Sequence, residues 1–519
     1  MTKIFRTGEQ FPPEKDIPRL AQYKRGQRIY EGRHAEIYER ASSLLKDTPF
    51  APQLETLFIA VNVADVLMTK PADLLIGEPP TYDSGKGKDS REQERLDSIT
   101  EENDINRLIY ESTIGAGYRG DAWFKTYYAQ RADFSETEAL GLPAPEAPLE
   151  PIIENVPANL VFPELAAGSR KKFKALNIAW IDWVEEPGGR VIRWITGNAA
   201  SYVPYLVVER HVPGYITYER YRLSEKSVNA EWGVPISTYT IGDQVATGRE
   251  SDVIETGTPQ LLVHHAPYKT TDDSWRGESA VSKMESVLAA INDRLVQVDY
   301  ILFRHSDPTA YGPELDGVED GTGQSIRWGG KYIPLSNGDP TPGYMVWNSQ
   351  LEGAFKELDY LLGLVFLMAE TPQWLFGTTI TADRGGTGTS HTDGASIGMR
   401  MMPILKKVER IRAHMDRAIR DAIWTAMQLE NFANRNVEGF VPYEPVYPTI
   451  EWRDGLPKDA KAEAETMSIR TGGKATLDVA TAIKRLDAIS DAQAAHIITQ
   501  IDADEERTLG TVDTTVFNE

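Results

Sequence analysis

Residues 281–302 read VSKMESVLAAINDRLVQVDYIL, and the spacing of their apolar side chains decides the fold expected for this chain. The apolar positions follow one another in steps of three and four, which predicts a helix with one narrow face that packs along another helix. These positions are Val281, Met284, Leu288, Ile291, Leu295, Val298 and Leu302.

A second stretch with this spacing follows at residues 351–369, LEGAFKELDYLLGLVFLMA. Its C-terminal half is apolar all round, and we expect that half to be fully enclosed. The apolar positions that should pack against the first helix are Leu351, Phe355, Leu358, Leu362, Val365 and Ala369.

The segment between the two helices, residues 306–350, contains five prolines, many glycines and short β-like runs at 325–328 and 331–335. It offers little room for a core, so we expect a two-helix stalk that carries a compact β-rich tip. A tip of this size needs neighbours to bury its apolar face, which makes self-association a physical expectation.

Toward the N-terminus, residues 16–76 read as helical, with a break near Pro71 because proline removes a backbone donor. A helix is expected around 103–115 and an aromatic-rich strand at 120–128. Residues 136–157 are rich in proline, alanine and glutamate, which is typical of a surface insertion.

Residues 174–260 favour strands, with one hairpin turning at 187–189 and another at 213–214. A very long helix is expected from about residue 395 to 431, kinked near Pro403, before an alanine-rich helical segment from about residue 458. The predicted fold class is therefore α+β, with long helices beside a β-rich part.

The charge balance of the 519-residue chain is 55 basic against 77 acidic side chains, a net charge of −22. Such a balance argues against a protein that grips phosphates through a net positive surface. The chain has no cysteine, which excludes disulfides and thiolate chemistry. The N-terminus lacks a secretory pattern, and the longest apolar stretch, 360–369, is about half of a membrane span. We expect no membrane contact.

Motifs that carry chemistry are missing from the sequence. The glycine-rich loop between Gly385 and Ser390 has hydroxyls but no lysine, so a flexible loop is favoured over a phosphate cradle. The eight histidines show no metal-ligand spacing, and there is no GxSxG elbow. We expect no enzyme activity, no cofactor and no metal.

One cluster of basic residues is an exception in this acidic chain. It could contact nucleic acid or an acidic neighbouring subunit, but a solvated helix face with pairs such as Asp416–Arg420 and Glu409–Arg412 is favoured. The cluster consists of Lys406, Lys407, Arg410, Arg412, Arg417 and Arg420.

The order of these parts resembles the portal proteins of tailed bacteriophages over most of the chain. The segment from Asn62, NVADVLMTKPADLLIGEPPTY, is similar to the family's pattern of an Asn, an apolar helix and a Gly-x-Pro exit. The run 103–128, which ends in GDAWFKTYY, is similar to the family's helix followed by a glycine-led aromatic strand. Gly277, Glu278 and Ser279, then Ile291 and Asn292, resemble the opening of the first stem helix. TDGASIGMRM, from Thr392, and TGGKATLDVATAIKRLDAISD, from Thr471, are similar to the opening of the long helix and to the C-terminal pattern. The sequence departs from the family in the 136–157 insertion and in having Thr-Asp-Gly where Ser-Gly is usual.

The resemblance implies a division of the chain into named regions. They are a wing at 1–276, a first stem helix at 277–305, a small α/β clip at 306–350, a second stem helix at 351–370, a tunnel loop at 371–391, a long kinked helix with the return to the wing at 392–454, and a helical crown at 455–519. Candidate DNA-contacting residues of the tunnel loop are Thr378, Thr379, Thr381, Asp383, Arg384, Thr387, Thr389, Ser390 and His391. Candidate partner-docking residues of the clip are Arg327, Trp328, Lys331 and Tyr332.

The same resemblance implies a dodecameric ring of this chain at one capsid vertex of the virion, assembled in the host cytoplasm. Its partners would be the terminase large subunit, the head-tail adaptor, the major capsid and scaffolding proteins, and double-stranded DNA that passes through without sequence-specific contact. An acidic channel suits this task, because each strong phosphate contact would add drag. Two alternatives stay open: a phosphate-binding enzyme of phage DNA metabolism that uses the 385–390 loop, and a head or neck structural protein without a channel.

Overall fold

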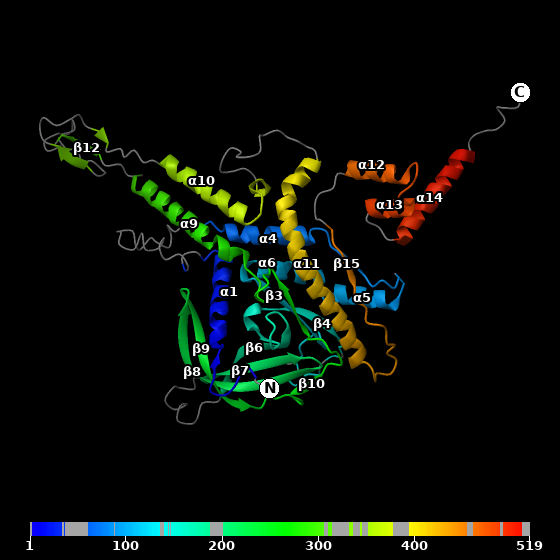
Figure 1. Ribbon diagram of the computed structural model, residues 1–519, viewed down its shortest axis with the longest axis horizontal. Coiled ribbons are helices and arrows are strands. Elements are labelled where there is room, and N and C mark those ends of the chain that lie inside the picture. The colour runs from blue at the N-terminus through cyan, green and yellow to red at the C-terminus, as the bar shows by residue number, and fades with distance from the viewer. Residues whose placement is uncertain are drawn as a thin grey trace. The chain divides into compact units, whose positions relative to one another are not determined.

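The computed structural model has an α+β fold in which strands and helices alternate unevenly along the chain (Figure 1). The chain divides into two compact units, residues 1–388 with 401–455 and residues 389–400 with 456–519, and we treat each by itself. The structure describes residues 3–33, 36, 61–87, 89–134, 137, 140–143, 145, 147–186, 201–305, 310–313, 332–335, 343–344, 351–376, 394–453, 460–487 and 491–510.

A seven-stranded antiparallel sheet, curled into a half-barrel, dominates the first unit. Its strand order is β1-β9-β8-β7-β6-β5, and β10 pairs with the start of β8, on the edge that β9 does not reach. The pairing of β8 with β9 shifts register twice, and such bulges bend a strand and help a sheet to curl. The strands are β1 (Gln10–Phe11), β5 (Val161–Leu165), β6 (Phe173–Glu186), β7 (Ser201–Val212), β8 (Tyr215–Glu231), β9 (Val234–Val245) and β10 (Val253–Glu255).

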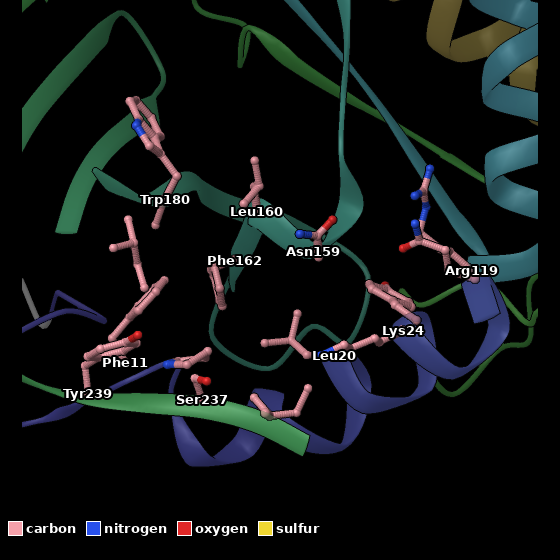
Figure 2. Close-up of a pocket in the computed structure, with 16 residues that line it drawn as sticks. Phe11, Leu20, Lys24, Arg119, Asn159, Leu160, Phe162, Trp180, Ser237 and Tyr239 are labelled. Atoms are coloured by element: carbon pink, nitrogen blue, oxygen red, sulfur yellow. The ribbon is translucent and has the colours of Figure 1, made fainter. Parts of the chain in front are cut away.

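Helix α1 (Ile17–Tyr30) packs against β9 and β8 and covers part of this sheet. The rings of Phe5, Phe11 and Phe162 lie 5.5–5.6 Å apart in the core between them. A cavity of about 420 Å³ remains beside this core, surrounded by side chains of α1, β1, β6 and β9 (Figure 2). Lys24 on its wall donates to the carbonyl of Pro235, so this cationic group already has a partner.

A second group of elements lies between the half-barrel and the long helices. The three-stranded sheet β11-β3-β4 consists of β3 (Asp121–Gln130), β4 (Leu149–Val156) and β11 (Val263–Pro267). The helices α4 (Val63–Ile76), α5 (Arg91–Glu102) and α6 (Ile105–Arg119) lie near it, and β2 (Thr81–Asp83) pairs with β15 (Thr449–Glu451). The pairing of β2 with β15 brings the chain back to its N-terminal part after the long helices.

Helices α9 (Ala280–His305) and α10 (Leu351–Met368) pack along each other and form the predicted pair (Figure 1). Arg294 and Glu357 join them by an ion pair of 2.7 Å. Between the two helices in sequence, β12 (Ala310–Pro313) pairs parallel with β13 (Tyr332–Leu335) and antiparallel with β14 (Gly343–Tyr344). Tyr332 opens β13 opposite Ala310, whereas Arg327, Trp328 and Lys331 lie outside the described residues.

Helix α11 (Gly394–Ala433) confirms the long helix predicted at 395–431. The second unit contains α12 (Ala460–Thr471), α13 (Val479–Asp487) and α14 (Asp491–Gly510), with α13 packed against both of the others. No helix in the described ranges combines the length and the apolar character that a membrane span requires.

Two sequence expectations are corrected, and a third is confirmed in part. Helix α4 runs through Pro71 without ending. The burial of this proline in the core outweighs the loss of one backbone hydrogen bond. Residues 136–157 are not only an insertion, since Leu149–Val156 form strand β4 along β3 with Ile152 and Ile153 buried. The first predicted hairpin turn, at 187–189, lies outside the described residues, whereas the turn at 213–214 between β7 and β8 is confirmed.

The end of α10 is not enclosed within the chain, contrary to expectation. Tyr360 is 59% exposed, Leu367 74% and Met368 43%. At the other end of the pair, Leu302 and Phe355 are exposed as well, so these two predicted packing positions are not covered within a single chain. The reason is that α1, α4 and α6 cover only one side of the pair, near Val281 and Val365.

The other predicted packing positions on the two helices are buried or partly buried within the chain. Val281, Met284, Leu288, Ile291, Val298, Leu358 and Val365 are buried, and Leu295, Leu351 and Leu362 are partly buried.

Candidate functional site

Asp121, the first residue of β3, joins the helix pair to the rest of the first unit. Its side chain has no exposure, and its carboxylate accepts hydrogen bonds from the Tyr23 hydroxyl on α1 and from His265 Nε2 on β11 at 2.7 Å. It also accepts from the backbone N–H of Gly277 at 2.7 Å, just before α9. One buried carboxylate therefore fixes three segments that are far apart in sequence.

The backbone around Gly277 lies against the end of α6 so closely that no side chain fits. A Cβ on Gly277 would lie 1.9 Å from the carbonyl oxygen of Gly120. Ser279 Oγ lies 2.9 Å from the Tyr118 carbonyl and accepts from the N–H of Val281 at 3.1 Å. This Gly-Glu-Ser segment, the α6–β3 junction at Gly120 and residues 369–371 after α10 are called the base of the helix pair below.

Two asparagines join the pair to the N-terminal helices. Asn292 on α9 is buried, donates to the carbonyl of Leu288 at 3.0 Å and accepts from the N–H of Val61 at 3.3 Å. Asn62 caps α4 by accepting from the N–H of Asp65, and donates to the Tyr30 carbonyl at 2.8 Å. The asparagines that carry the family resemblance thus lie in one connected joint.

The chain leaves α10 at a second fixed point of the base. Lys407 on α11 is buried, and its Nζ donates to the carbonyl of Ala369 at 2.9 Å. Burial lowers the pKa of Lys407 to about 8, with the repulsion of Arg410 adding to the effect and the attraction of Glu370 opposing it. Arg410 donates to the Glu370 carboxylate, so two cations of α11 hold the segment that leads into the predicted tunnel loop.

Tyr268 connects the two fixed points. Its backbone N–H donates to the Gly120 carbonyl at 2.8 Å. Burial raises the pKa of its hydroxyl, and the nearby Glu370 carboxylate raises it further. The tyrosine therefore stays neutral beside the exit of α10.

The basic cluster on α11 does not form one cationic patch. Lys407 is buried, Arg412 donates to the Arg453 carbonyl at 2.7 Å, and Arg420 pairs with Asp416 at 3.2 Å, as the solvated-face interpretation predicted. Glu409 pairs with Lys406 rather than with Arg412. Of the six, Arg417 is the most exposed, and its pair with Asp421 is long at 3.8 Å.

The predicted tunnel loop falls mostly outside the described residues, which end at 376 and resume at 394. Thr371, its first residue, is buried. The nine candidate DNA-contacting residues, from Thr378 to His391, and the glycine-rich loop at 385–390 all lie in the segment that is not described.

Sequence reasoning missed Asp121 and Tyr268, because their partners come from segments more than 90 residues away or from the backbone. It also missed the basic run 169–174, SRKKFK, which was visible as four cations in five positions of an acidic chain. In the described part of the chain, no group of three or more histidine and carboxylate side chains is placed to hold a metal ion.

Buried hydrogen bonds hold the base of the helix pair together. Each polar group of Asp121, Asn292 and Ser279 is used to hold backbone or side chains of neighbouring elements. In comparisons with known proteins, neither a protein-family model nor a curated protein matches this chain.

Proposed function

We propose that the chain is the subunit of a ring-shaped phage portal, the channel for DNA packaging and ejection at one capsid vertex. The proposal combines the resemblance of the sequence motifs with the arrangement of α9 and α10. Terminase, the head-tail adaptor, capsid and scaffolding proteins are its proposed partners, and the small sheet β13-β12-β14 is the proposed docking region.

The exposed apolar surface of the helix pair carries the proposal. Phe355, Tyr360, Leu367 and Met368 on α10 and Leu302 on α9 are 43–74% exposed. Helices with apolar side chains on two faces require a second cover, and a neighbouring copy in a ring supplies one. The buried hydrogen bonds of the base fit this task, because a ring needs every subunit to present its helices at the same angle.

Imaging of the purified chain tests the proposal directly. We expect closed rings in negative-stain micrographs and a matching mass in mass photometry. Leu367→Asp should prevent ring formation while the monomer stays folded, because Leu367 is already exposed in the single chain. Leu140→Asp, which changes a residue that is 73% exposed elsewhere, is the matched control and should leave the rings intact.

The two alternatives give different results in the same preparation. Monomers at all concentrations would contradict the ring, and closed particles without an axial opening would favour a head or neck protein that has no channel. ATP hydrolysis by the pure chain would favour the enzyme that uses the 385–390 loop.

A further inference from the structure

Two clefts of the first unit collect cations that the acidic composition of the chain does not lead one to expect. The first has a volume of about 540 Å³ and lies between α11, the start of β11 and the turn before β6. Lys171, Lys172 and Arg417 line it, against Asp421 as its acidic residue. We call it the first basic cleft.

The second basic cleft, of about 680 Å³, lies on the other side of the start of β6. The rings of Phe173 in the first cleft and Trp275 in the second lie 5.8 Å apart and separate the two. The basic residues that line the second cleft are Lys3, Arg6, Lys15, Arg19, Lys174 and Arg276.

Two of the three acidic groups of the second cleft are committed to other partners, and the exposed Glu9 is the third. Asp16 pairs with the buried Arg19 at 3.1 Å, and Glu164 pairs with Arg210 at 3.0 Å. Of the cations of this cleft, Lys3 pairs with Glu219. Lys171, Lys172 and Lys174, by contrast, are exposed, and no ion pair joins them to a carboxylate in the described ranges. Their charges are therefore available to an anionic partner.

His264 lies at the wall of the first cleft, with its ring nitrogen Nε2 buried. His264 is only 9% exposed, and its Nε2 has no hydrogen-bond partner among the described residues. Burial, reinforced by the neighbouring His211, lowers the pKa of His264 to about 3, so the ring is neutral at pH 7.

We propose that the two basic clefts bind an extended, Asp- and Glu-rich segment of a partner protein. A cleft of several hundred Å³ has room for single carboxylate side chains of an extended peptide. A DNA duplex presents its phosphates on a rigid convex surface, which does not enter such a cleft. The half-buried rings of Phe173, Trp275 and Trp424 between the cations suit the apolar side chains of a peptide. The proposal does not depend on ring formation, because all these residues belong to one unit of one chain.

Binding of labelled deca-glutamate to the full chain, followed by fluorescence anisotropy at low salt, tests this proposal. We expect saturable binding that Lys171→Glu/Lys172→Glu weakens by about tenfold or more, since reversing two cationic contacts replaces attraction by repulsion. Lys226→Glu changes an exposed lysine on β8, outside both clefts, and should change the affinity by less than about twofold. Circular dichroism of each variant checks that the fold is kept.

Unlabelled competitors identify the chemistry that is recognised. Displacement of the peptide by a second acidic peptide at lower concentration than by a short DNA duplex supports the proposal. Absence of binding, equal binding by Lys171→Glu/Lys172→Glu and Lys226→Glu, or tighter binding of the duplex through the same lysines would each overturn it.

Discussion

At the scale of single residues, Asp121 accepts more hydrogen bonds than any other side chain described at the base of the helix pair. Three donors from α1, β11 and the start of α9 converge on its carboxylate, which has no contact with water. A buried donor that loses its acceptor bears the full cost of desolvation. Replacement of this carboxylate should therefore loosen three elements at once.

We expect Asp121→Ala to lower the free energy of unfolding by about 3–5 kcal/mol, the range for removal of one partner from a buried charged contact. Urea unfolding followed by circular dichroism measures the change. Asp121→Asn keeps the shape and one acceptor oxygen and should cost less than Asp121→Ala. Asp272→Asn, on an exposed loop, is the control, and a loss of equal size there would contradict this role of Asp121.

The lowered pKa of Lys407 predicts how the stability of the chain changes with pH. Its pKa is about 8 in the folded chain because of burial, against an ordinary value of 10.5. Between these values the unfolded chain holds a proton that the folded chain has released, so the contribution of Lys407 to stability rises as the pH increases from 8 to 10.5.

The comparison with Lys407→Met isolates this contribution, since all other titrating groups are shared. We expect wild type to gain stability relative to Lys407→Met as the pH rises through this window, measured by urea unfolding at several pH values. A relative loss with rising pH would mean that the attraction of Glu370 dominates and that the pKa of Lys407 is raised.

At the scale of elements, the contact between Gly120 and Gly277 sets how α9 starts. Gly277→Ala would place a Cβ 1.9 Å from a backbone oxygen, so the two segments must separate. We expect a loss of several kcal/mol in the free energy of unfolding, in line with other cases of overpacking and broken buried hydrogen bonds. Gly353→Ala on α10 meets no atom within 4 Å and should stabilise the chain by about 0.5–1 kcal/mol. Equal effects of the two substitutions would rule out the close approach as the cause.

Burial decreases along the packed face of α9, which predicts that substitutions there differ in how much they destabilise the chain. Leu295 is packed against the buried cluster of the helix pair, whereas Leu302 on the same face is 48% exposed. Leu295→Asp should destabilise the chain by several kcal/mol or abolish assembly, because it places a charge among apolar side chains. Leu302→Asp should leave the monomer stable, and thermal unfolding of both variants distinguishes them. Rings and stability unaffected by Leu295→Asp would show that the spacing was misinterpreted.

The elements that the sequence predicted are those with a strong local pattern. The apolar spacing in α9 and α11 and the Pro-Gly turn between β7 and β8 were sufficient to predict these features, because each signal lies within a short stretch of sequence. Strand β4 was missed because the composition around it is typical of loops. The network around Asp121 could not be predicted, since its donors Tyr23 and His265 lie 98 and 144 residues away in sequence and leave no local pattern.

At the scale of the whole molecule, the described chain folds back on itself. Strand β15 pairs with β2, and Arg95 on α5 pairs with Glu430 on α11 at 2.6 Å. The helix pair and the small sheet are therefore an excursion from a unit that is completed by residues 401–455. The excursion is nevertheless part of the same core, because the helix pair packs on α1, α4 and α6.

The net charge of −22 gives a prediction about assembly. Copies of an acidic chain repel each other, whereas the exposed apolar side chains of α9 and α10 attract each other independently of salt. The range of the repulsion falls from about 30 Å at 0.01 M to about 8 Å at 0.15 M ionic strength. We therefore expect the oligomeric fraction, measured by sedimentation velocity, to rise with sodium chloride over this range. Leu367→Asp should remove the salt-promoted species, and an oligomeric fraction that falls with salt would mean that ion pairs between subunits, rather than apolar contacts, hold the assembly together.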